Sequence, residues 1–84
     1  MTDSRKEHAV ATIKEAIAEA AKEYPGGFIP RTKVPFFTGG LYSAGYLANC
    51  DSRGDGVKGS FRIGRQRVYP LSALADWLIE RVEV

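Results

Sequence analysis

Basic side chains of the kind that contact phosphate are concentrated in one part of this 84-residue sequence. Residues 26–70 hold seven basic against two acidic side chains, a net charge of +5, whereas residues 1–25 carry −1 and residues 71–84 carry −2. The seven are Arg31, Lys33, Arg53, Lys58, Arg62, Arg65 and Arg67. A basic block between acidic segments indicates contact with a polyanion such as nucleic acid.

No pattern for catalysis or metal binding accompanies this block. The single histidine, His8, has no second ligand nearby, and the single cysteine, Cys50, suits a small half-buried apolar position. Residues 51–56 begin like a calcium loop, but Arg53 occupies a ligand position and Arg62 stands where the closing glutamate belongs. We therefore expect no enzyme, no catalytic residue, no metal ion and no cofactor.

The N-terminal segment has the clearest helical pattern. Apolar residues recur at helical spacing from Val10 to Tyr24, and the Pro25-Gly26-Gly27 run ends the helix. We expect residues 1–27 to form an amphipathic helix with its stop, followed by one domain over residues 28–84. The pattern leaves open whether this helix packs on that domain or pairs with a copy of itself.

The domain over residues 28–84 is predicted to hold three shorter helices. The first covers residues 31–38, and the last covers residues 71–81 with Trp77 in its buried stripe. Between them, Ser43 is suited to cap a helix over residues 44–53, and Gly54 to end it in the left-handed conformation. One side of that middle helix carries Ala44, Leu47, Cys50 and Asp51, and the other carries Gly45, Tyr46, Asn49, Ser52 and Arg53.

A β-hairpin is predicted directly after the middle helix. Residues 60–63 alternate polar and apolar as a half-buried strand does, residues 64–66 form a tight connection, and residues 67–69 return. Phe61 and Ile63 are expected on one side with Val68 opposite them. Arg62, Arg65 and Arg67 are expected to project to solvent or to a polyanion.

The segment from Ile29 to Arg81 resembles the small winged helix-turn-helix of phage excisionases, prophage regulators and the DNA-binding domains of MerR-type regulators. The resemblance rests on the turn at 38–40, on Tyr46-Leu47, on the run 62–69 and on the run 74–78. It implies a mainly α fold with a small β-hairpin (α+β), in which a winged helix-turn-helix follows an extra N-terminal amphipathic helix.

The resemblance also implies a function: double-stranded DNA binding, in excision or in transcription regulation. The middle helix would enter the major groove, with Asn49 on an adenine edge and Arg53 on a guanine or a phosphate. The hairpin would act as the wing, on the backbone or in the minor groove. The DNA-binding residues expected on this basis are Ser43, Gly45, Tyr46, Asn49, Arg53, Lys58, Arg62, Arg65 and Arg67.

Partners follow from the same resemblance. Excisionase-like proteins act with a recombinase, and the N-terminal helix offers a route to self-association. No apolar run approaches the roughly 20 residues of a membrane span, and a lone cysteine fits a reducing cytoplasm. The alternative function is a protein-interaction adaptor that keeps the winged-helix fold without binding nucleic acid.

Overall fold

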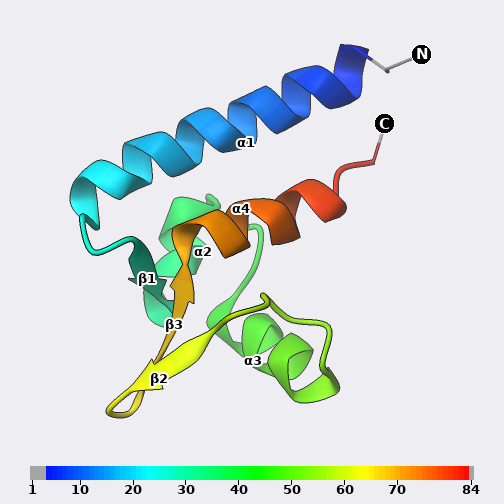
Figure 1. The fold of residues 1–84 in the computed structure, drawn as a ribbon. Coiled ribbons are helices and arrows are strands. Elements are labelled where there is room, and N and C mark those ends of the chain that lie inside the picture. Colours follow the sequence, from blue (N-terminus) through cyan, green and yellow to red (C-terminus); the bar gives the residue numbers. More distant parts are fainter. Residues whose placement is uncertain (1–3, 84) are drawn as a thin grey trace.

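The computed structural model describes residues 4–83, which form a mainly helical α+β fold (Figure 1). In chain order the elements are α1 (Ser4–Glu23), β1 (Phe28–Pro30), a 3-10 turn η1 (Arg31–Lys33), α2 (Val34–Phe37), α3 (Ala44–Arg53), β2 (Phe61–Ile63), β3 (Gln66–Pro70) and α4 (Leu71–Glu80). The predicted helices are therefore present at the expected positions, with residues 31–37 divided between η1 and α2. No helix among the described residues has the length and apolarity needed to cross a bilayer.

The sheet has one strand more than the sequence predicted. Its order is β1-β3-β2, antiparallel throughout, because Ile29 pairs with Tyr69 and Phe61 pairs with Val68. The amide of Leu71 donates to the carbonyl of Gly27 over 2.8 Å, which ties the start of β1 to the start of α4. A three-residue strand gives too short an alternation to be recognised from sequence alone.

One face of the sheet is turned to the core. Partners in an antiparallel register lie on the same face, and successive residues alternate. Ile29 and Tyr69, both almost fully buried, therefore mark the inner face, and Arg62 and Arg67 continue that face along the hairpin. The core beneath them contains Val34, Leu47, Cys50, Val57, Leu71, Leu74 and Trp77.

Strand β2 was predicted to be half-buried, but all three of its residues are exposed. Phe61 and Ile63 are 42% and 50% exposed, although Val68 does lie opposite Phe61 and is buried. The Phe61 ring meets Phe28 edge to face at 5.8 Å between centroids. β2 is a short edge strand, and the buried cluster lies on the other face of the sheet, so its apolar side chains stay partly in water.

Helix α1 packs along α4, and the two run in opposite directions in Figure 1. Ala20 belongs to the buried cluster, and Ile17 and Tyr24 pack against it. The chain after Glu23 turns through Pro25 and Gly27, whose φ of +86° is a value that glycine adopts without strain. In this chain the apolar stripe of α1 is thus covered, at its C-terminal half, by the rest of the protein.

Candidate nucleic-acid interface

Helix α3 is positioned by both of its ends, as the sequence predicted. The Ser43 hydroxyl accepts a hydrogen bond from the Tyr46 amide over 3.0 Å, and Gly54 ends the helix with φ +85°. Leu47 and Cys50 fix its inner side, since they are 1% and 0% exposed. The outer side is in water, and it carries Gly45, Tyr46, Asn49, Ser52 and Arg53.

The Tyr46 ring is held in place although it is 41% exposed. It stacks on Tyr42 with 5.4 Å between centroids, and Tyr42 in turn meets Trp77 edge to face at 5.0 Å. This aromatic chain runs from the core to the surface of α3. One turn further along, the Asn49 amide makes no hydrogen bond within residues 4–83 and is free to bind a ligand.

Arg53 is less free than its sequence position suggests. Its Nε lies 3.5 Å from the Asp55 carboxylate, and its Nη2 lies 3.4 Å from Cys50 Sγ. The Asp55 charge is the main reason that the pKa of Arg53 is raised. Both partners of the ion pair are more than half exposed, so the pair is weak and Arg53 can exchange Asp55 for another anion.

Arginines line the hairpin that follows. The turn between β2 and β3 is Gly64-Arg65, with Gly64 at φ +61°, and Arg65 is exposed at the tip. Arg62 and Arg67 are directly opposite each other in the register, and neither makes an ion pair within residues 4–83. Like charges at directly opposed positions destabilise a strand pair. The opposed arginines therefore weaken the pairing of β2 with β3.

The loop between α3 and β2 brings Lys58 to the inner face of the hairpin. Lys58 and Arg67 line one small hollow with Asp51 at the end of α3, of about 190 Å³. Gly56 makes this approach possible, because a Cβ at that position would collide with Asp51. Residues from the C-terminal end of α3, from the loop and from β3 thus line one hollow.

Sequence reasoning missed a polar network beneath this surface. Arg31 Nη2 donates to Asp51 Oδ2 over 2.5 Å, the Tyr69 hydroxyl donates to the same oxygen over 2.8 Å, and Arg31 Nε donates to the Tyr69 hydroxyl over 2.9 Å. Burial is the main cause that raises the pKa of Tyr69 to about 12. Burial lowers the pKa of Arg31, but its hydrogen bonds to Tyr69 and Asp51 outweigh this, and the net shift is upward.

This network changes the charge count of the basic block. Arg31 forms an ion pair with Asp51 in the partly buried network, and Arg53 forms one with Asp55 at the surface. Within residues 4–83, the basic side chains of the block that make no ion pair are Lys33, Lys58, Arg62, Arg65 and Arg67. Of the nine residues predicted for DNA contact, five lie along α3 or at its cap, and four lie on the loop and hairpin.

The remaining polar chemistry is structural. Trp77 Nε1 donates to the Asp55 carbonyl over 3.1 Å, and Arg81 stacks on the Trp77 ring at 3.6 Å, so α4 holds the loop after α3. Among the described residues, no group of three His, Cys, Asp or Glu side chains is placed to hold a metal ion. No protein-family model matches the chain, and no curated protein or solved structure is similar to it at a significant level.

Proposed function

We propose that the protein binds double-stranded DNA as a winged helix-turn-helix, with α2, the 38–43 turn and α3 as the helix-turn-helix and the β2–β3 hairpin as the wing. The observation that carries the proposal is the pairing of Arg62 with Arg67 across the hairpin. Two arginines at directly opposed positions of a strand pair cost stability in the free protein. A row of phosphates supplies the missing negative charge.

The exposed side of α3 is suited to the major groove, which admits one helix. Asn49 can bond an adenine edge through its free amide, while Tyr46 has little freedom to lose because Tyr42 already holds its ring. Arg53 can leave the exposed Asp55 for a guanine or a phosphate. Ser43 is engaged as the helix cap, and Gly45 lies in the first turn, where backbone N–H groups can approach a phosphate oxygen.

A single winged helix-turn-helix of this size contacts few DNA bases. Useful specificity then requires several copies on adjacent sites, or a protein partner such as a recombinase, and excision and transcription control are both compatible outputs. The cationic surface supplies the sequence-independent part of the affinity. Lys58, Arg62, Arg65 and Arg67 make no ion pair within residues 4–83, and Arg53 becomes a fifth contact when it leaves Asp55. These five groups set the upper limit of the salt dependence.

The experiment that tests the proposal is fluorescence anisotropy with a selected and a scrambled duplex at several salt concentrations. If four or five phosphates are contacted, the log–log slope of affinity against salt is about −4 to −5. Replacing Arg65 and Arg67 by alanine is expected to weaken binding to both duplexes similarly and to flatten the slope by up to about two. Asn49→Ala is expected to cost about 1–3 kcal/mol at one base pair of the selected site and little on the scrambled duplex.

The matched control is Lys6→Ala with Lys14→Ala, which removes the same charge from exposed positions on α1. This variant should lose much less affinity than the hairpin variant, because its charges lie outside the proposed interface. Equal losses for the two double variants would mean that only net charge matters. If the hairpin variant binds both duplexes as tightly as the wild type, the wing is no DNA contact and the adaptor function becomes the better proposal.

A further inference from the structure

Asp55 is an exposed acidic side chain within the basic block. Residues 26–70 hold two acidic side chains, Asp51 and Asp55. Asp51 is bound by Arg31 and Tyr69 in the partly buried network, whereas the Asp55 side chain is 57% exposed. A carboxylate at a basic surface repels phosphate, so Asp55 lowers the affinity of this surface for any DNA.

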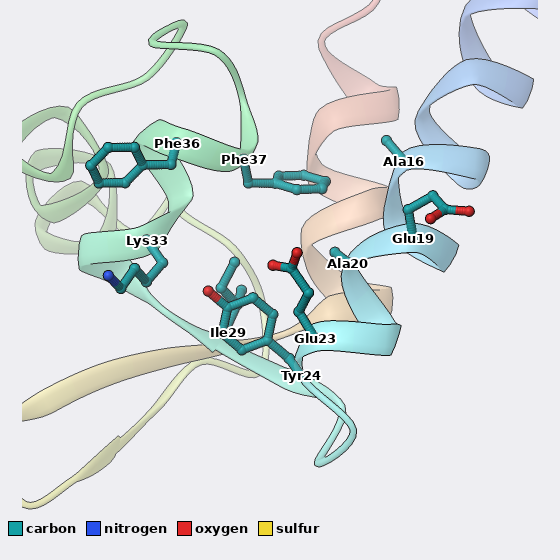
Figure 2. Close-up of a pocket in the computed structure, with 9 residues that line it drawn as sticks. All are labelled: Ala16, Glu19, Ala20, Glu23, Tyr24, Ile29, Lys33, Phe36 and Phe37. Carbon is teal, nitrogen blue, oxygen red and sulfur yellow. The ribbon is translucent and has the colours of Figure 1, made fainter.

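No carboxylate of α1 or α4 makes an ion pair with Arg53 within residues 4–83. Figure 2 shows Glu19 and Glu23 on α1, at a cavity of about 390 Å³ between α1 and α2. Asp76 and Glu80 lie on α4, where they line a hollow of about 480 Å³ together with the loop after α3. The carboxylate that acts directly on Arg53 is therefore that of the loop residue Asp55.

Backbone hydrogen bonds fix the position of Asp55. Its amide donates to the Cys50 carbonyl over 3.1 Å, and its carbonyl accepts from Trp77 Nε1 over 3.1 Å and from Arg81 Nη2 over 3.3 Å. Both backbone polar groups of the residue are thus bonded, to α3 on one side and to α4 on the other. The carboxylate is in this way held beside the last turn of α3.

The contact with Asp55 uses one edge of the Arg53 guanidinium. Nε lies 3.5 Å from Asp55 Oδ1, and Nη2 donates to Cys50 Sγ over 3.4 Å. A guanidinium is a planar fork of five N–H donors, two of them on each Nη, so Nη1 and one N–H of Nη2 remain for a ligand. The O6 and N7 atoms of guanine accept from two arginine donors at once. Arg53 can therefore bind a guanine edge while its Nε stays on Asp55.

A phosphate contact has a different energetic balance. A phosphate that approaches Arg53 brings its negative charge close to the Asp55 carboxylate, and the two like charges repel. A guanine edge has no net charge and meets no such repulsion. Asp55 therefore disfavours the contact of Arg53 with the DNA backbone more than its contact with a base.

We propose that Asp55 is a specificity-determining residue, which holds Arg53 toward a guanine edge in the major groove and opposes the use of Arg53 on phosphate. This inference rests on the proposed function, because it requires α3 to contact DNA. Asp55 is a positioning residue, since it acts on the DNA through Arg53. The sequence-independent affinity then comes from the loop and the hairpin.

The test compares the isosteric variant Asp55→Asn with the wild type by anisotropy, on the selected and the scrambled duplex. Affinity for the scrambled duplex is expected to rise by about two- to fivefold, because Arg53 is released for phosphate. Affinity for the selected duplex should stay within about twofold, because the loss of positioning offsets the loss of repulsion. The matched control is Asp76→Asn, which removes the same charge from an exposed position of α4 and should change both affinities equally.

A double-mutant cycle shows whether the effect passes through Arg53. Arg53→Met should abolish the preference for one guanine of the selected site, and adding Asp55→Asn to this variant should leave the ratio of the two affinities unchanged. The NMR signal of Arg53 Nε–H in the free protein should shift in Asp55→Asn and not in Asp76→Asn, a readout that needs no DNA.

The outcomes separate this inference from the proposed function. A wild type that binds neither duplex would overturn both. A wild type that binds both duplexes, with Asp55→Asn behaving like Asp76→Asn, would overturn only the role of Asp55. The same holds if Asp55→Asn lowers the ratio of the two affinities equally in the presence and absence of Arg53.

Discussion

At the scale of single residues, the network of Arg31, Asp51 and Tyr69 links three elements that lie far apart in the sequence. It joins η1, α3 and β3, and Asp51 Oδ2 accepts from both partners. A partly buried carboxylate is stabilised by pairing and hydrogen bonding, so each member depends on the other two. The orientation of α3 relative to the sheet is fixed by this contact and by the packing of Leu47 and Cys50.

Tyr69→Phe is expected to lower the free energy of unfolding by about 1–2 kcal/mol at pH 8, because Asp51 loses one of its two donors in a partly buried site. Tyr46→Phe, at an exposed ring, should change it by less than about 0.5 kcal/mol. Urea unfolding followed by circular dichroism measures both. Equal effects of the two substitutions would show that the hydroxyl of Tyr69 contributes nothing.

The difference in the free energy of unfolding between the wild type and Tyr69→Phe is also expected to depend on pH. The pKa of Tyr69 is raised to about 12 in the folded protein from an ordinary value near 10. Ionisation therefore favours the unfolded chain, and the stability linked to the neutral phenol, complete below pH 10, is lost as the pH rises toward 12. The difference in stability between the wild type and Tyr69→Phe should shrink over this interval and stay constant below it.

At the scale of elements, the hairpin combines two features that oppose its own stability. Its inner face sets Arg62 against Arg67, and its outer face leaves Phe61 and Ile63 partly in water. A strand pair under no other demand would place opposite charges or β-branched residues at positions 62 and 67. We attribute this composition to the proposed contact of the hairpin with DNA.

Arg62→Thr should therefore change stability and binding in opposite directions. Removing the repulsion and introducing a residue of higher β-propensity should raise the free energy of unfolding by about 0.2–1 kcal/mol. Affinity for duplex DNA should fall, and the salt slope should decrease by about one. Thermal melting and anisotropy on the same sample measure both, and a variant that loses both stability and affinity would contradict the assigned repulsion.

At the scale of the whole molecule, acidic and basic side chains lie on different elements. Helix α4 and the residues after it are acidic, whereas the loop and hairpin next to α3 carry Lys58, Arg62, Arg65 and Arg67. In Figure 1, α1 and α4 lie side by side at the top, and α3 and the hairpin lie below them. Helix α1 supports this arrangement, since Ile17 and Ala20 pack on the same core that positions α3.

Shortening the side chain in Ile17→Ala is expected to lower the free energy of unfolding by about 1–3 kcal/mol, because apolar contacts between α1 and the core are lost. Glu15→Ala, at an exposed position of the same helix, should stay within about 0.5 kcal/mol of the wild type. Denaturant unfolding measures both. An unchanged midpoint for Ile17→Ala would mean that α1 does not contribute to the stability of the chain.

Local signals in the sequence were sufficient for the helices and for the caps of α3. Residues close in the chain determine the Ser43 cap, the left-handed Gly54 and the two sides of α3. Propensity and periodicity therefore predicted these features correctly. The hairpin and the position of Val68 opposite Phe61 were also predicted, because alternation over a few residues is a local signal. The predicted connection over residues 64–66 was one residue too long, since Gln66 pairs with Ile63 and the turn is Gly64-Arg65.

Only the tertiary structure decided which basic groups remain free and which surfaces adjoin. Strand β1 forms because β3, about 40 residues away, offers it an edge, and no local pattern records such a pairing. Arg31 is removed from the cationic set by Asp51 and Tyr69, at separations of 20 and 38 residues. Long-range contacts of this kind depend on how packed elements meet in space, which is why composition alone overestimated the free charge.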